Sequence, residues 1–142
     1  MDPMDRLLTR LRHASEASQA AKDRVIQDSG LTKAQYSALL MLDRVDRATA
    51  TQLAVACEVS QQAMSQTVIR LVDGGFVAIE RSPDGGRSRV LTLTNRGRAS
   101  LGLADERVVA LEAALRGAVP PERLDGVLDA LAAIQRTAES LS

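Results

Sequence analysis

The sequence predicts a mainly helical protein with one small β-hairpin. Alanine (22) and leucine (19) supply 41 of the 142 residues, while only Tyr36 and Phe76 are aromatic. Such side chains favour closely packed helices, whereas sheets are enriched in aromatic and β-branched residues. Apolar residues recur at helical spacing over most of the chain and change to short alternating runs only near residues 76–94. The length fits one domain with helical extensions.

Two helices are expected at the start of the chain. Small or apolar residues are spaced alternately four and three apart over residues 4–27, which forms a seam along one helix face. Ser29-Gly30 predicts the end of this helix. Thr32, followed by Gln35, predicts the capping box of a second helix that ends near Arg47. The side chains expected to point inward from it are Tyr36, Leu39, Leu40 and Val45.

A short helix over residues 51–57 is expected to precede a longer, polar one. Ser60 reads as the N-cap of this second helix, and Gly74-Gly75 as its end. Its apolar stripe consists of Met64, Val68, Leu71 and Val72. Its opposite face shows Gln61, Gln62, Ser65, Gln66 and Arg70.

The apolar period then changes from helix to strand. Residues 76–81 and 89–94 predict two strands, and the turn cluster at 82–86 joins them as a hairpin. After Gly97 the chain is helical again, and Pro120-Pro121 begins a last helix. Apolar stripes on these helices comprise Leu101, Val108, Leu111, Leu115 and Val119, then Leu124, Val127, Leu128, Leu131, Ile134, Ala138 and Leu141.

The terminal helices, residues 4–27 and 99–141, flank a centre of about 60 residues, typical of a small domain. A helix of about 24 residues is about 36 Å long, more than such a centre can cover. Homodimerisation through these helices is therefore expected. An intrachain three-helix bundle is the alternative.

Charge is balanced overall but not along the chain. Eighteen basic and eighteen acidic residues exclude a uniformly basic nucleic-acid coat. Residues 60–98 hold six arginines against three acids, a net charge of +3, and residues 99–142 hold four against seven, a net charge of −3. The basic segment contains the helix whose polar face carries Gln, Ser and Arg, which suit base edges and phosphates. A merely solvated face is the alternative.

The order of the predicted elements also indicates nucleic-acid binding. A short helix, a turn, a polar helix and a hairpin form a helix-turn-helix followed by a wing. The second helix of such an arrangement can enter the major groove, and the wing reaches the minor groove. Arg87 stands at the expected hairpin tip, where a narrow minor groove would attract it.

Other classes of function are disfavoured. One histidine, His13, and one cysteine, Cys57, leave no nucleophile–base pair and no metal site, so we expect neither an enzyme nor a cofactor. No apolar run exceeds five residues, and the N-terminus has no apolar stretch of signal-peptide type. A soluble, cytoplasmic protein without membrane contact is expected.

The segment LAVACEVSQQAMSQTVIRLVDGGFVAIERSPDGGRSRVLTLTNRG, residues 53–97, resembles the MarR family of bacterial winged-helix transcriptional regulators. The matching features are Leu53-Ala54, Ser60, Leu71-Val72-Asp73 with the following glycines, Pro83, Arg87, and Leu93-Thr94 with Gly97. The resemblance implies a winged helix-turn-helix DNA-binding region at 32–98. It also implies that residues 1–31 and 99–142 form a dimerisation region, because the long terminal helices of family members interlock.

The resemblance also assigns candidate site residues. The residues that would face the major groove are Ser60, Gln61, Gln62, Ser65, Gln66 and Arg70. Arg87 would be the wing arginine, and Arg89 would lie near the DNA backbone. Two departures stand out. Gly85 occupies the place of the family's usual wing aspartate, with Asp84 beside it, and Glu58 lies in the turn where a small residue or glycine is common.

Candidate switch residues each have a structural alternative. Family members bind small acidic ligands between the dimer helices and the winged domain, where the resemblance places His13 and Tyr36. The alternatives are a surface or interface histidine and a core tyrosine with its hydroxyl satisfied. Cys57 follows Leu53 by four residues on the inward helix face, which favours a core cysteine over a redox sensor.

The sequence thus predicts a homodimeric regulator of MarR type, a repressor that binds an inverted-repeat operator in double-stranded DNA. Its two recognition helices would lie about 34 Å apart. A small aromatic or acidic effector is expected to release it by favouring another spacing. A winged-helix protein-interaction module without DNA binding is the second hypothesis, and steep salt dependence would distinguish DNA binding from it.

Overall fold

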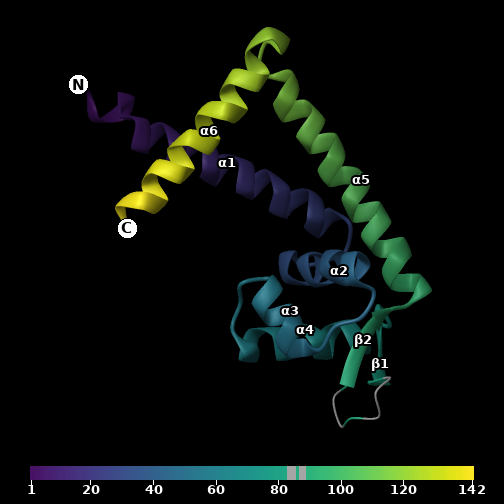
Figure 1. Ribbon diagram of the computed structural model, residues 1–142. Helices are drawn as coiled ribbons and strands as arrows, with labels where there is room; N and C mark the ends of the chain where they lie inside the picture. Colours follow the sequence, from purple (N-terminus) through teal and green to yellow (C-terminus); the bar gives the residue numbers. More distant parts are fainter. Residues whose placement is uncertain (83–85, 87–88) are drawn as a thin grey trace. The chain divides into compact units, whose positions relative to one another are not determined.

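The computed structural model describes residues 1–82, 86 and 89–142 (Figure 1). Residues 83–85 and 87–88, which include the predicted wing arginine Arg87, lie outside the described residues. The Cα positions divide the chain into two compact units, residues 1–108 and 109–142. We describe each unit separately.

Helices α1 and α2 begin the first unit. A 3-10 turn at Pro3–Asp5 precedes α1, Leu7–Asp28, which ends before Gly30 with its φ of 91°. The capping box predicted at Thr32 and Gln35 is present, and α2 spans Lys33–Val45. The prediction that Val45 points inward is wrong, because Val45 is the last residue of α2 and its side chain is 53% exposed.

Helices α3 and α4 follow. Helix α3, Ala50–Ala56, begins earlier than predicted because Thr49 caps it, accepting a hydrogen bond from the Gln52 N–H at 3.1 Å. Helix α4, Gln61–Asp73, has the predicted N-cap: the Ser60 hydroxyl accepts a bond from the Ala63 N–H at 3.1 Å. Its end is also as predicted, since Gly74 is the C-cap.

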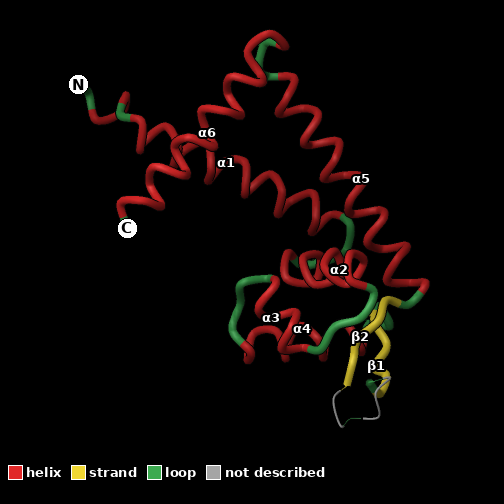
Figure 2. Tube along the Cα trace, viewed as in Figure 1, coloured by secondary structure: helices red, strands yellow, loops and turns green. Residues whose placement is uncertain are grey.

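The hairpin consists of β1, Val77–Arg81, and β2, Arg89–Leu93 (Figure 2). The strands are antiparallel, with Val77 opposite Leu93 and Arg81 opposite Arg89. An additional bridge, which the sequence did not predict, joins Ala48 to Leu91. The Leu91 N–H donates to the Ala48 carbonyl at 2.8 Å, which attaches the α2–α3 connection to the hairpin.

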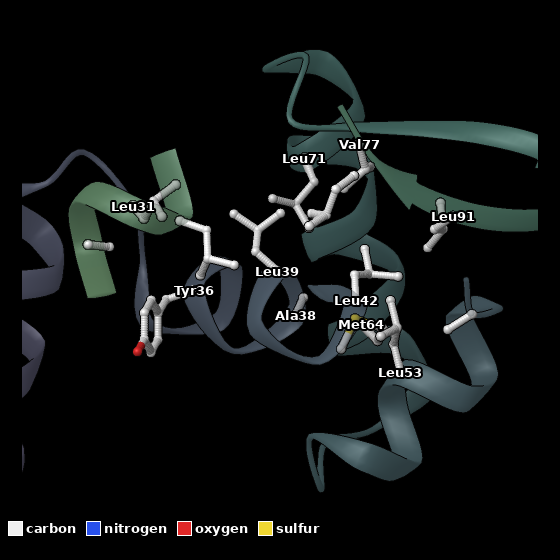
Figure 3. Close-up of a cluster of buried hydrophobic side chains, with 14 of the residues drawn as sticks. Leu31, Tyr36, Ala38, Leu39, Leu42, Leu53, Met64, Leu71, Val77 and Leu91 are labelled. Carbon is white, nitrogen blue, oxygen red and sulfur yellow. The ribbon is translucent and has the colours of Figure 1, made fainter. Parts of the chain in front are cut away.

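The core of the first unit lies between α2, α3, α4 and the hairpin, and it also includes Ile26 of α1 and Leu101 and Ala104 of the helix that follows the hairpin. Figure 3 shows the side chains that converge there, among them Leu39, Leu42, Leu53, Leu71 and Val77. Of the predicted α4 stripe, Met64 and Leu71 are buried, and Val68 and Val72 are half-buried. The buried hydroxyl of Thr67 donates to the Ala63 carbonyl at 3.1 Å, so its burial leaves no polar group unpaired.

Helix α5, Asn95–Gly117, leaves the hairpin, and the part before residue 109 belongs to the first unit. It begins two residues before Gly97 because the Thr94 hydroxyl accepts a bond from the Gly97 N–H at 3.0 Å. A Cβ at Gly97 would lie 2.0 Å from the Phe76 carbonyl oxygen, so only glycine allows this approach.

The second unit comprises the rest of α5 and α6, Pro121–Leu141. None of its residues is buried. The exposed large apolar side chains of α6 are Val127, Leu128, Leu131 and Leu141. Among the described residues, no helix is both long and apolar enough to cross a membrane.

Candidate nucleic-acid interface

The polar face of α4 is presented to solvent as the sequence predicts. Met64, Thr67 and Leu71 are buried on the opposite side. Because successive residues are about 100° apart around a helix, this packing directs the other side outward. The exposed residues predicted to contact DNA from this helix and its cap are Ser60, Gln61, Gln62, Ser65, Gln66 and Arg70.

Two of these residues also have structural contacts. The Ser60 hydroxyl accepts the capping bond at the start of α4. Gln61 lies toward α3, where the Thr51 hydroxyl donates to its Oε1 at 3.4 Å. The side chains of Gln62, Ser65 and Gln66 are exposed on the same outward face.

The backbone conformation of the turn between α3 and α4 explains why a glycine, rather than a residue such as Glu58, is common at this position. The Val59 N–H donates to the Ala54 carbonyl at 3.0 Å, and the Glu58 N–H to the Val55 carbonyl at 3.2 Å. This pair of bonds is a Schellman motif, whose central residue adopts the left-handed conformation. Glu58 does so with a φ of 56°. A glycine is favoured there for steric reasons.

The hairpin carries arginines close together. Arg89, a predicted DNA contact, is directly opposite Arg81 in the strand register, and both are exposed. Directly opposed residues of antiparallel strands share a face, and like charges there are destabilising. An arginine pair in this position is therefore suited to a polyanion. Arg81 is a candidate that the sequence prediction missed, because it depends on the register.

The residues proposed for ligand binding lie apart. The Tyr36 hydroxyl donates to Asp105 Oδ1 at 2.8 Å, and Lys22 Nζ is 5.8 Å from the centre of its ring. His13 is exposed on α1, with Nε2 3.3 Å from Arg12 Nη2. Since His13 precedes Lys22 by nine residues, the two lie about 13 Å apart along the helix. The structure therefore does not bring His13 and Tyr36 together.

Tyr36 and Cys57 have environments typical of core residues. Burial, with the hydrogen bond and negative charge of Asp105, raises the pKa of Tyr36 to about 12. Burial also raises the pKa of the Cys57 thiol, which is half-buried against the core. Redox-sensing cysteines have a lowered pKa and an accessible thiol. The environment of Cys57 thus favours the core interpretation.

Chemical sites of other kinds are not evident in the described part of the chain. No group of three or more His, Cys, Asp or Glu side chains there could hold a metal ion. A cavity of about 310 Å³ lies beside α4, lined by Lys33, Cys57, Val59 and Met64 among others. The polar helix face and the arginine pair are the features that suggest a macromolecular ligand.

Comparisons with known proteins agree with this interpretation. A MarR-family model matches residues 29–88. The HTH-type transcriptional repressor Rv2887 of Mycobacterium tuberculosis is 38% identical over 84 residues, which are 59% of this chain and 60% of the repressor. The chain therefore aligns with less than two thirds of that relative.

Solved structures are similar over nearly the whole chain. The repressor CouR, bound to a 23-mer DNA duplex, has 28% identity and a TM-score of 0.78, covering 92% of this chain and 93% of CouR. Sco5413 of Streptomyces coelicolor, a MarR family transcriptional regulator, has 25% identity and a TM-score of 0.75, covering 99% and 98%.

Proposed function

We propose that the chain is a winged helix-turn-helix regulator of the MarR family, whose model matches residues 29–88, and that it represses transcription by binding double-stranded DNA as a homodimer. Helix α4 would enter the major groove, and the hairpin would contact the flanking backbone and minor groove. The observation that carries the proposal is the exposed Gln/Ser/Arg face of α4, together with the opposed pair Arg81 and Arg89 on the hairpin.

The DNA complex of CouR supports the same ligand for this chain, because the two are similar over 92% of its length. Residues 32–98 would form the DNA-binding region. Arg87, outside the described residues, would be the wing arginine. In this proposal the arginines contribute affinity through phosphates, and Gln62 and Gln66 contribute sequence preference.

The dimer is proposed from the terminal helices, residues 1–31 and 99–142. Helix α6 has no buried residue, and even its large apolar side chains Leu128 and Leu131 are 42% and 47% exposed. On α1, Leu7 and Leu8 are 57% and 79% exposed. Exposed leucines on long amphipathic helices favour a covering surface. A second copy would supply it and place two α4 helices on an inverted repeat.

Release by a small aromatic or acidic effector is part of the same proposal. The effector would favour a dimer whose α4 spacing does not fit the operator, and its effect is limited by its differential affinity for the two states. Tyr36 of α2 donates a hydrogen bond to Asp105 of α5. A ligand that breaks this bond would therefore change the contact between α2 and α5.

DNA binding can be tested by selecting duplexes from a random library with the purified protein. The bound duplexes are then titrated at 50 and 200 mM salt. We expect an inverted repeat with half-sites one helical turn apart, and binding that falls steeply with salt. Arg89→Ala should weaken binding to all sequences, whereas Gln66→Ala should change the selected sequence. Arg44→Ala, at an exposed arginine on α2 that is not a predicted DNA contact, is the matched control for lost charge.

No enrichment, with a protein that is folded and dimeric, would refute DNA recognition. A partner interaction that is insensitive to salt would instead support the protein-interaction module.

The dimer requires a separate experiment. Sedimentation of the wild type should give twice the mass of the chain, and a double change of Leu128→Glu and Leu131→Glu should give one mass. A wild-type monomer at micromolar concentration would refute the dimer.

A further inference from the structure

Helix α4 carries one large apolar side chain within its outward polar face. Ile69 is 60% exposed. At about 100° per residue it lies about 20° around the helix from Gln62 and about 40° from Ser65. It is therefore at the centre of the predicted DNA-contact face, whereas the apolar stripe of the same helix is on the buried side.

A single exposed apolar residue on a protein surface is ordinary. The surroundings of Ile69 make it informative, because its neighbours Gln62, Ser65 and Gln66 are all polar and exposed. In the proposed complex this face would be dehydrated in the major groove. A side chain there without donors or acceptors can gain free energy only from an apolar partner. The apolar group that bases present in the major groove is the 5-methyl group of thymine.

We propose that Ile69 is a specificity-determining residue that recognises a thymine methyl group in each operator half-site. This inference rests on the proposed DNA-binding function and adds to it a named base and group. Cytosine, which lacks the methyl group, would leave the apolar surface of Ile69 without a partner.

The spacing of residues also locates the thymine. Ile69 follows Gln66 by three residues, which is about 4.5 Å along the helix axis. Successive base pairs are about 3.4 Å apart. For an α4 that lies along the groove, we expect this thymine within one or two base pairs of the pair contacted by Gln66. Glutamine favours adenine, so we expect A·T pairs at both positions.

The test replaces thymine by deoxyuridine, which removes only the methyl group. Each thymine of the selected operator is replaced in turn, symmetrically in both half-sites, and affinity is measured at one salt concentration. The wild type should lose affinity at one position, within one or two base pairs of the pair affected by Gln66→Ala. The loss expected from burying one methyl-sized group is about fourfold per half-site.

The variant Ile69→Ala should bind the thymine and deoxyuridine operators equally, and Ile69→Val should retain part of the difference. Because Ile69 is exposed, neither change is expected to unfold the protein, which a melting curve checks. Val55→Ala, at a site 75% exposed on α3, is the matched control and should keep the wild-type pattern.

Two results would overturn the inference while leaving the proposed function intact. One is a wild type that binds its operator with no sensitivity to any deoxyuridine, and the other is an Ile69→Ala variant that keeps the full sensitivity. If the wild type selects no duplex at all, the proposed function fails and this inference fails with it.

Discussion

Gly97 is the position where the structure makes the sharpest stability prediction. It lies in the first turn of α5, against the residue that precedes β1. A Cβ built there would be 2.0 Å from the Phe76 carbonyl oxygen and 3.0 Å from its carbon. The same carbonyl accepts a hydrogen bond from the Thr94 N–H at 3.1 Å, so both backbones are held in place. The variant Gly97→Ala must therefore separate them.

The expected cost follows from this geometry. An ordinary contact needs more than 3.0 Å, so the backbones would have to move apart by about 1 Å or more. Overpacking in a well-packed region costs about 1–3 kcal/mol, and fixed backbone on both sides argues for the upper end. The methyl group also offers a helix-propensity gain of about 1 kcal/mol, which leaves a net loss of about 2 kcal/mol.

Urea unfolding followed by circular dichroism would measure this loss at fixed protein concentration, because the proposed dimer would make stability depend on concentration. Gly102→Ala is the matched control, in the same helix but with nothing within 4 Å of the added Cβ. It should raise stability by about 0.5–1 kcal/mol. If Gly97→Ala is as stable as the wild type, or if the two variants change stability in the same direction, the close-approach argument is wrong.

Three further predictions concern Glu58, Tyr36 and Cys57. Glu58→Gly should stabilise the protein by about 1 kcal/mol in urea unfolding, because it relieves a left-handed φ of 56°. It should also tighten DNA binding at low salt by removing an acid near the phosphates. In the folded protein the pKa of Tyr36 is raised from 10.0 to about 12. Its protonated hydroxyl therefore contributes to folding stability in full below pH 10, and this contribution is lost as pH rises through 12. Tyr36→Phe should remove that part of the alkaline loss, measured as the urea midpoint against pH. The Cys57 thiol, with its raised pKa, should react with iodoacetamide at pH 7 more slowly than a free cysteine, measured by mass spectrometry.

The sequence predicts features whose signals are local. Thr32 and Gln35 lie three residues apart and form a capping box within a single turn, and the Ser60 cap is equally local. The glycine that ends α1 could be predicted in the same way, because Gly30 adopts a φ of 91° that other residues avoid. These signals need no knowledge of the rest of the chain.

Features that depend on distant residues could not be predicted in this way. Tyr36 and Asp105 are 69 residues apart, and the bridge from Ala48 to Leu91 joins a connection to a strand. Arg81 could be recognised only once the hairpin register placed it opposite Arg89. Ile69 is different, because the sequence alone could have placed it on the polar face. It follows Gln62 by seven residues, which puts both on the same side of the helix.

Some of these features reduce folding stability or contribute little to it, which suggests another role. Arg81 and Arg89 repel each other across the hairpin, and Ile69, which is 60% exposed, buries little apolar surface in the core. DNA would turn both into favourable contacts, since phosphates neutralise the arginines and a methyl group covers the isoleucine. Glu58 has no such compensation. Its negative charge would be repelled by phosphates, and its left-handed backbone conformation is sterically unfavourable for a residue with a side chain. Glu58→Gly should therefore raise stability and affinity together, whereas Arg89→Ala should separate them by relieving repulsion while weakening DNA binding.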